Sequence, residues 1–185
     1  MNATAKIDGQ VISPQTELSD DDQYLTFHLS NEMFAVGILN IKEIIEYGHL
    51  TTVPMMPEFV RGVINLRGSV VPVIDLQARF GRKSSVVGKR TCIVIVEVVV
   101  YEQIQTIGII VDAVSAVISI PGSDIEKAPE FGAKLRTDFI FGMGKIEDEF
   151  VIILNIGQVL SINEMLSLVE KIDLSNSDEQ QHLLF

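Results

Sequence analysis

Side chains able to do chemistry are few in this sequence and lie far apart. His28 falls in a strand-like stretch, His49 in a predicted turn and His182 near the C-terminal end, and none has a carboxylate or cysteine at metal-ligand spacing. The single cysteine, Cys92, lies in an apolar stretch and is predicted to be core filler. No glycine pattern typical of a phosphate-binding loop occurs. We therefore expect no metal site, no cofactor and no catalysis.

Two aspartates that follow aliphatic runs, Asp75 and Asp112, are the remaining candidates for acid–base chemistry. Residues placed in this way more often end strands by accepting hydrogen bonds from nearby backbone N–H groups. We therefore predict a structural role for both.

The segment Asn65-Leu66-Arg67-Gly68 places an amide and a guanidinium in a turn between apolar runs. Arg67 has a planar fork that holds a carboxylate with two hydrogen bonds, so it is a candidate docking residue for a partner. Glu43 is an alternative partner for it within the chain. An ordinary surface turn is the competing interpretation.

Composition narrows the classes of partner. The 185 residues carry 14 basic and 25 acidic side chains, for a net charge of −11, which argues against nucleic acid as the main partner. Apolar residues make up 47% of the chain and favour a compact fold. No apolar run approaches the roughly 20 residues of a membrane-spanning helix, so we expect no direct membrane insertion.

Alternating and β-branched stretches predict a mainly β protein between two flexible tails, residues 1–22 and 173–185. The predicted strands are residues 24–29, 33–38, 70–74, 92–100, 106–111 and 150–154. Pro72 predicts an edge position or a bulge for its strand. Apolar residues at 162, 165, 166, 169 and 172 predict a helix over 162–172, with Asn163 as its N-cap.

An internal repeat organises these strands. Residues 59–76 align without a gap on residues 139–156, and the segment from Ala35 to Ile45 aligns on the segment from Gly108 to Ile118. The offset between equivalent positions is constant within each pair of segments. We therefore predict two copies of one small β-barrel unit, with Phe59 and Phe139 in the core.

The run GVINLRGSVVPVIDL, within residues 53–81, resembles the CheW family of coupling proteins of bacterial chemotaxis. Residues 34–46, 107–120 and 139–156 support the resemblance, which spans about residues 23–170. It implies two SH3-like five-stranded β-barrels with a shared core, plus the short C-terminal helix, in one domain. We expect the first barrel at about 23–88, the second at about 89–160 and the helix at about 162–172.

The resemblance also implies partners and contact residues. The family has no catalytic activity and bridges the cytoplasmic tips of methyl-accepting chemotaxis receptors and the regulatory domain of the histidine kinase CheA, so a cytoplasmic protein recruited to receptor arrays is expected. Contacts to kinase or neighbouring coupling proteins match Ile125 and Phe131. Receptor contacts match Ile41, Glu43, Ile44, Gly62, Arg67, Val114 and Val117.

Four positions depart from the usual family pattern. They are Gln77 in place of arginine, Ala116 in place of an acidic residue, Glu126 in place of a basic residue and Asn155 in place of aspartate. Glu126 puts the kinase-side contact in doubt, although Lys127 stands beside it.

Three functions remain open at this point. The first is an adaptor between receptors and a histidine kinase, and a variant of it is a regulatory module or kinase-binding scaffold of a related pathway for surface motility. The second is a regulatory fragment of the kinase itself, and the third is an enzyme. The sequence shows no nucleotide site and no catalytic constellation for the last two.

Overall fold

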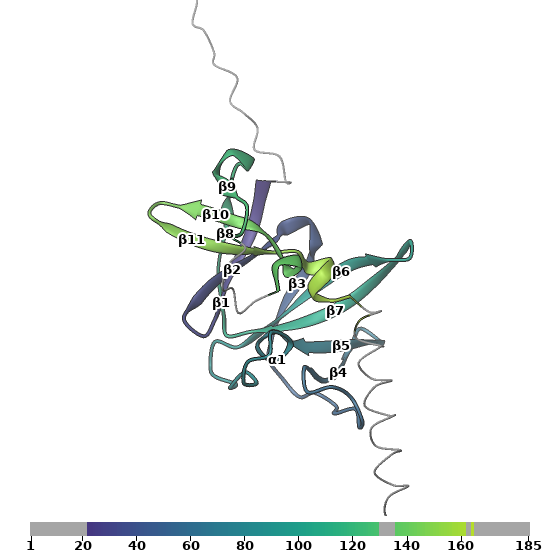
Figure 1. The fold of residues 1–185 in the computed structure, drawn as a ribbon. Coiled ribbons are helices and arrows are strands. Elements are labelled where there is room, and N and C mark those ends of the chain that lie inside the picture. Colours follow the sequence, from purple (N-terminus) through teal and green to yellow (C-terminus); the bar gives the residue numbers. More distant parts are fainter. Residues whose placement is uncertain (1–21, 130–135, 162–163, 165–185) are drawn as a thin grey trace, which may run out of the picture.

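The computed structural model describes residues 22–129, 136–161 and 164, and most of this part is β-strand (Figure 1). Two four-residue helices, α1 (Leu76–Arg79) and α2 (Ile156–Val159), and three 3-10 turns, η2 (Ile38–Asn40), η3 (Gly122–Asp124) and η4 (Thr137–Phe139), connect the strands. The strands are β1 (Gln23–Leu29), β2 (Glu32–Gly37), β3 (Ile41–Glu46), β4 (Val60–Leu66), β5 (Ser69–Asp75), β6 (Cys92–Val100), β7 (Gln103–Val111), β8 (Ala113–Ser119), β9 (Ile125–Glu126), β10 (Ile140–Ile146) and β11 (Glu149–Leu154).

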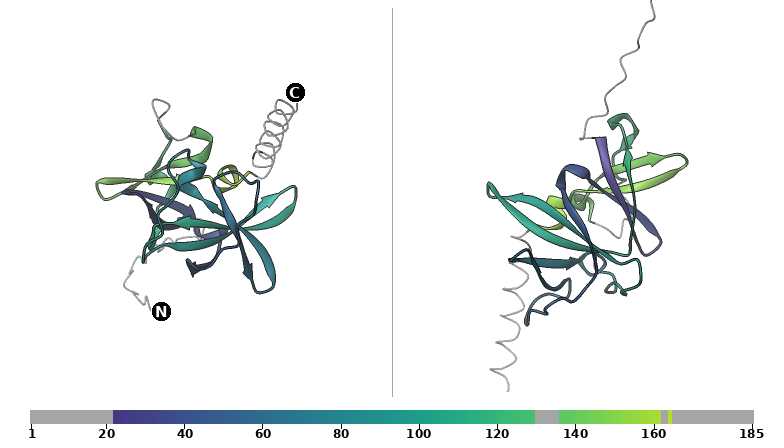
Figure 2. Two further views of the ribbon diagram at one scale, coloured as in Figure 1. Left: turned by 90° about the horizontal axis from the view of Figure 1, so that it is seen from below. Right: turned by 180° about the vertical axis from the view of Figure 1, so that it is seen from behind.

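The strands form two sheets, which confirms the prediction of a mainly β protein built from two units. One sheet has the order β8-β1-β2-β11-β10-β9, and the other has the order β3-β6-β7-β5-β4. Antiparallel hairpins make up most of each sheet, and each sheet also contains one parallel pair: β2 with β11, and β5 with β7. Figure 2 shows the two twisted sheets from below and from behind.

The division of the chain between the two units differs from the expected split near residue 88. Strand β3 pairs with β6 and β5 with β7, both of which come after the split, while β1 pairs with β8 and β2 with β11. Each sheet therefore takes strands from both halves of the chain. The first sheet also gains a sixth, two-residue strand, β9. The offsets locate equivalent strands but do not identify which copy each strand pairs with.

The repeat appears directly in the strand register. Ile41 lies opposite Val96 in one sheet, and its equivalent Val114 lies opposite Phe27 in the other. The hairpin of β6 and β7 is the longer of the two equivalent hairpins, because both of its strands have 9 residues, whereas β1 has 7 and β2 has 6. The two sheets therefore share one strand arrangement and differ in the length of one hairpin.

The largest core cluster joins the two sheets, because it contains buried residues of β1, β2, β5, β6, β7 and β11 together with both helices. Phe59 and Phe139 belong to it, at 8% and 1% exposure, which confirms their predicted burial. Each of two smaller clusters packs within one of the two sheet units. Cys92 is half-buried and packs against the joint cluster.

Pro72 lies in β5, which is an internal strand of its sheet, and not at an edge. The proline is tolerated because the parallel pairing of β5 with β7 begins only at Val73. The predicted tails, the helix over 162–172 apart from Glu164, and Phe131 lie outside the described residues.

Candidate functional site

The ion pair of Arg67 with Glu43 is the centre of the candidate docking surface. Arg67 donates from both terminal nitrogens of its guanidinium to the two carboxylate oxygens of Glu43, each at 2.8 Å. This bidentate geometry is the strongest arrangement of such a pair. The structure therefore selects the internal partner of Arg67 over the alternative of a fork left open.

The local backbone explains how Arg67 reaches Glu43. Arg67 and Gly68 form the two-residue turn between β4 and β5, with φ values of 49° and 85°. Two positive φ values define the hairpin turn that matches the twist of the strands. Arginine rarely adopts this conformation, at a cost of about 1–3 kcal/mol. The side chain of Asn65 steadies the turn by accepting a hydrogen bond from the N–H of Gly68 at 2.8 Å.

Apolar side chains flank the pair on β3. Ile44 follows Glu43 directly and is 42% exposed, whereas Ile41 is half-buried and packs against the core shared by the two sheets. A bulge between Ile41 and Glu43 shifts the register of β3 against β6. The edge strand β3 thus carries the charged pair at Glu43 and an exposed isoleucine at the next position, on alternate faces of the strand.

The second group of predicted receptor contacts lies on the equivalent edge strand of the other sheet. Val117 is 51% exposed on β8, and Val114 is half-buried against the shared core. The charged pair is missing here, because Ala116 stands at the position equivalent to Glu43 and Glu147 at the position equivalent to Arg67. The hydroxyl of Thr26 donates instead to the backbone carbonyl of Ala116, at 2.9 Å.

Gly62 is among the receptor contacts that the resemblance implies, but it does not lie at the surface. It is buried, and a Cβ atom added to it would lie 2.5 Å from the backbone oxygen of Thr51. The two backbones exchange hydrogen bonds at this point through Val63 and Thr51. The glycine therefore allows the loop before β4 to approach the strand.

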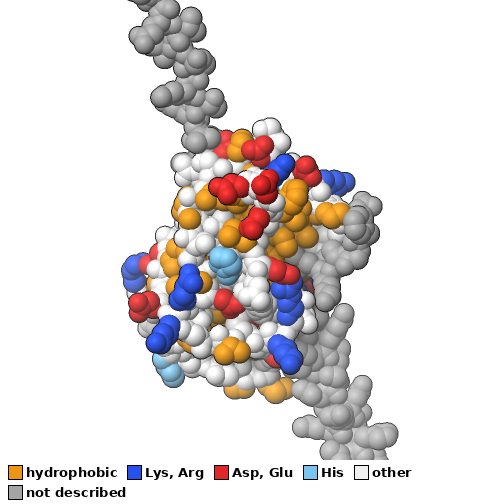
Figure 3. Space-filling view, turned by 90° about the vertical axis from the view of Figure 1, so that its left-hand side faces the viewer, with side chains coloured by type: hydrophobic (Ala, Val, Ile, Leu, Met, Phe, Trp, Pro, Cys, Tyr) orange, Lys and Arg blue, Asp and Glu red, His pale blue; other side chains and the backbone are white. Residues whose placement is uncertain are grey.

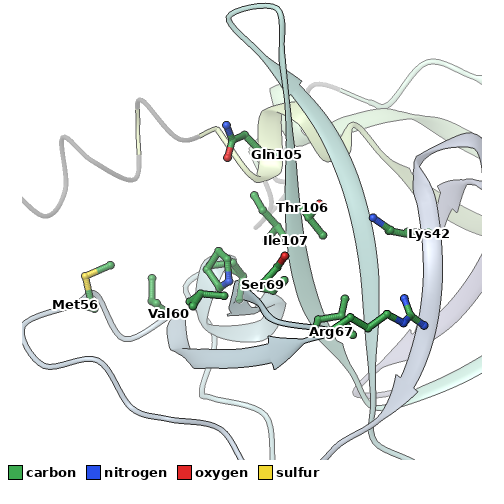
Figure 4. A pocket seen from close by; sticks show the side chains of 13 residues that line it. Lys42, Met56, Val60, Arg67, Ser69, Gln105, Thr106 and Ile107 are labelled. Carbon is green, nitrogen blue, oxygen red and sulfur yellow. The ribbon is translucent and has the colours of Figure 1, made fainter.

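An apolar groove borders Arg67. It encloses about 560 Å³ between β4, β5 and β7. In Figure 4, Lys42 and Arg67 lie at one end of this groove and Met56 and Val60 at the other. We call it the β5–β7 groove. Its apolar lining residues are Met56, Val60, Leu66, Val70, Val71, Pro72, Ile74 and Ile107.

A different surface surrounds the equivalent turn of the second copy. Glu147, Asp148, Glu149 and the half-exposed Phe150 line a smaller hollow of about 240 Å³ at the β10–β11 hairpin. Figure 3 shows acidic side chains beside apolar ones in the upper part of that face, with lysine and arginine mostly lower down. The two copies of the repeat therefore present opposite charges at equivalent turns.

The predicted kinase-side contact at Ile125 falls on the short strand β9. Ile125 pairs with Gly144 of β10 and packs against the smaller core of its sheet. Its side chain fills the space next to Gly142, where an added Cβ would approach to 2.5 Å. Glu126 and Lys127, beside it, are exposed.

Asp75 takes the structural role predicted for it. Its fully buried carboxylate accepts hydrogen bonds from the guanidinium of Arg61 at 2.7 Å, from the backbone and hydroxyl of Ser85 at 2.8 Å each, and from the N–H of Gln77 at 3.0 Å. It also caps α1. Asp112 likewise accepts a hydrogen bond from a backbone N–H, that of Ser30, at 2.5 Å.

Arg79 is a buried residue that sequence reasoning missed. Its Nε donates to the carbonyl of Val159 at 2.8 Å, and its guanidinium lies over the rings of Phe59 and Phe139 at 5.3 and 4.6 Å. Burial lowers the pKa of Arg79, against the opposing charge of Glu164. Arg79 and Val159 occupy equivalent positions of the repeat, but equivalence alone does not indicate contact, so the sequence held no signal for this bond.

Two residues that depart from the family pattern have local partners. Gln77 is buried and donates from its amide to the hydroxyl of Ser30 at 2.7 Å. Asn155 caps α2 and is equivalent to Asp75. Within the described ranges, no three His, Cys, Asp or Glu residues come together as a metal site would need, and no helix has the length and apolar character to cross a membrane.

Comparison with known proteins gives one consistent family. The model of the CheW-like domain matches residues 23–164. A chemotaxis protein CheW of Klebsiella aerogenes is 34% identical over 154 residues, covering 83% of this chain and 90% of its own length. A protein of the same name from Helicobacter pylori is also 34% identical, with 80% of this chain and 87% of its own length covered.

A solved structure agrees with these sequence matches. The crystal structure of the scaffolding protein TtCheW from Thermoanaerobacter tengcongensis aligns with a TM-score of 0.69 at 35% identity. The alignment covers 77% of this chain and 90% of the other. A more distant relative, protein FrzA of Myxococcus xanthus, is 26% identical over 142 residues.

Proposed function

Because the chain belongs to the CheW family, we propose that it is the non-enzymatic adaptor that couples chemoreceptor tips to the histidine kinase CheA in chemotaxis signalling. In this proposal the protein is cytoplasmic and is recruited to receptor arrays by its partners. It joins them by binding alone, without a cofactor.

The observation that carries the receptor side of the proposal is the bidentate pair of Arg67 with Glu43 next to the exposed Ile44. The pair connects the β4–β5 turn to the edge strand β3 and so holds the turn in one fixed arrangement against that strand. Preorganised surfaces of this kind lose less conformational entropy on binding. Val114 and Val117 add to the proposed surface from the six-stranded sheet, at positions equivalent to Ile41 and Ile44.

The pair contributes little to folding, since the side chain of Arg67 is 73% exposed and that of Glu43 is 21% exposed. Exposed ion pairs contribute about 0–1 kcal/mol to stability. The energetic cost of an arginine at positive φ is therefore not offset by the pair in folding, which supports a role in binding.

The test is to measure the affinity of Arg67→Ala for a receptor cytoplasmic fragment and for the kinase regulatory domain. We expect receptor affinity to fall about 10–100-fold, since hydrogen bonds to charged groups contribute about 1.5–3 kcal/mol once a bound receptor shields them from water. Arg67→Lys restores it only in part, because a point charge lacks the fork. We expect a much smaller effect on kinase affinity and a melting temperature within a few degrees of the parent.

Arg82→Ala is the matched control, because it removes the same charge and an exposed ion pair, with Glu32, of 2.7 Å. The exchanged double variant Glu43→Arg with Arg67→Glu adds a second check, since it keeps the pair with its charges reversed. Equal receptor affinity of Arg67→Ala and Arg82→Ala would contradict the assignment. Unfolding of Arg67→Ala would make Arg67 a structural residue instead.

The kinase side of the proposal rests on Ile125 and Phe131 by resemblance, with Lys127 exposed beside Ile125. The variant of the proposal in a surface-motility pathway has one supporting observation, the match to protein FrzA. Pull-down with receptor fragments and kinases of each pathway, followed by identification of the bound proteins, distinguishes the two pathways.

A further inference from the structure

The β5–β7 groove lies where the pairing of two parallel strands stops. β5 pairs with β7 only from Val73, opposite Gly108, to Asp75, opposite Ile110. Pro72, which precedes Val73, has no N–H with which to continue the ladder. The groove therefore occupies the space between the unpaired first part of β5 and the adjoining residues of β7 (Figure 4).

The groove has a buried apolar floor and an exposed apolar rim. Val71, Ile74 and Ile107 line the floor and are each 2% exposed. Val70 and Met56 line the rim, at 74% and 39% exposure. A volume of about 560 Å³ with a mostly apolar lining falls within the range typical of small-molecule sites, about 300–1,000 Å³.

The charged groups that line the groove are both cations and lie at the same end of it. These are Lys42 and Arg67, and no carboxylate is found among the described lining residues (Figure 4). Their ion-pair partners, Glu97 and Glu43, do not line the groove. An ammonium has three N–H donors and a guanidinium five, of which the ion pairs use one and two. This end of the groove therefore has donors left for a further anionic group.

From the apolar floor and the two cations at one end, we propose that the β5–β7 groove binds a free monocarboxylate with a single unbranched apolar chain. The chain lies along the floor, where each CH₂ group removed from water tightens binding about fourfold. The carboxylate accepts charge-assisted hydrogen bonds from Lys42 and Arg67. The net charge of −11 opposes approach to an anionic membrane surface, so the ligand is the free acid and not a lipid of the bilayer. This inference does not depend on the receptor and kinase assignments above.

The test is an NMR titration of the full chain, isotope-labelled at its methionine methyl groups, with sodium decanoate below its micelle concentration. Met56 lines the groove, whereas Met33 lines the separate β10–β11 hollow. We expect a saturable shift of the Met56 methyl signal, with Met33 unchanged. Decanoate should bind about tenfold more tightly than octanoate, because its chain is longer by two CH₂ groups. Decanol should bind more weakly than decanoate, and decyltrimethylammonium more weakly still, because the cations repel it.

The variant Lys42→Gln removes one of the two cations and leaves the pair of Arg67 with Glu43 in place. We expect its affinity for decanoate to fall about 3–10-fold and its affinity for decanol to stay within about twofold of the parent. Lys145→Gln is the control, because Lys145 is an exposed lysine on β10, away from the groove. It should bind decanoate as the parent does.

The variant Val70→Glu places a carboxylate on the rim of the groove. Its matched control is Val99→Glu, since Val99 is also a strand valine, is 73% exposed and does not line the groove. We expect Val70→Glu to lose decanoate binding and Val99→Glu to retain it, with similar melting temperatures. The proposal would be overturned by an unsaturable Met56 shift, by equal losses in the two glutamate variants, or by equal effects of Lys42→Gln on decanoate and decanol. Binding of the protein to phosphatidylglycerol vesicles in preference to free decanoate would also overturn it.

Discussion

At the scale of single residues, two kinds of equivalent position in the repeat, glycines and helix caps, affect the fold in different ways. Gly62 and its equivalent, Gly142, are required by what approaches them, a backbone oxygen in one case and Ile125 in the other. Asp75 and Asn155 are equivalent helix caps, but only the aspartate is buried among several donor groups. Equivalent positions in the repeat therefore differ in how much of the fold depends on them.

We predict that Gly62→Ala destabilises the protein by about 1–3 kcal/mol, because the added methyl group meets the carbonyl oxygen of Thr51 at 2.5 Å. Gly48→Ala is the control, since a Cβ there has no atom within 4 Å. Urea unfolding of both variants measures the difference. A free energy of unfolding for Gly62→Ala that matches Gly48→Ala would show that the loop moves away freely.

We predict that Asp75→Ala lowers the free energy of unfolding by about 3–5 kcal/mol, because it leaves the Arg61 charge and the Ser85 groups without their acceptor. Asn155→Ala removes one exposed cap hydrogen bond and costs about 1 kcal/mol. Guanidinium unfolding of the two variants in parallel checks the ratio. Equal losses would contradict the importance of the buried network.

At the scale of elements, ion pairs of Arg136 connect the 3-10 turn η4 to Glu164. The 3-10 turn η4 precedes β10, and its Asp138 is bonded to Arg136, which also pairs with Glu164. The hydrogen bond from Arg136 holds the pKa of Asp138 below its usual value. Burial raises the pKa of Glu164, but the hydrogen bond from Arg136 and the charge of Arg79 outweigh this, so it too lies below its usual value.

This cluster predicts a pH dependence. Carboxyl groups with a lowered pKa in the folded state stabilise it fully above their unfolded pKa, about 4, and this contribution is lost as the pH falls through the folded pKa. We therefore expect the melting temperature of the parent to exceed that of Arg136→Gln at neutral pH, with the difference shrinking below about pH 4. Thermal unfolding from about pH 7 to about pH 3 measures it, and a constant difference would refute the role of the cluster.

At the scale of the whole molecule, exchange of strands between the two copies makes one folding unit. Strand β3 pairs with β6 and strand β8 with β1, so the first hairpin of each copy lies between strands of the other copy. Arg79 links the two short helices at the centre, between Phe59 and Phe139. A core shared in this way leaves neither copy with its own complete sheet.

We predict that residues 23–88 and 89–160, made as separate chains, do not fold alone, because each lacks strands of both sheets. Mixed together, they should recover β-structure. Circular dichroism of each fragment and of the mixture is the measurement, and the intact chain should unfold in one transition. A cooperative thermal transition of either fragment by itself would show that the copies are independent after all.

Local pattern was sufficient for several features that the structure confirms. Local patterns predicted strands at the positions of β1 and β2, constant offsets predicted the two copies, and both phenylalanines of the repeat lie in the core. These features follow from sequence because they depend on period and spacing along one stretch of chain. The pairing of Arg67 with Glu43 was open as one of two alternatives, since it needs a turn and a strand that are well separated along the chain to come together.

Tertiary structure alone decided the remaining features. Strand β3 pairs with β6 of the other copy and not with a strand of its own copy. The polarity pattern along β3 fits either pairing equally well, so long-range packing decides between them. The burial of Gly62 under Thr51 and the central position of Arg79 likewise depend on which backbones and rings meet in space. Residue type states what a group is able to do, and only the fold determines which neighbours it meets.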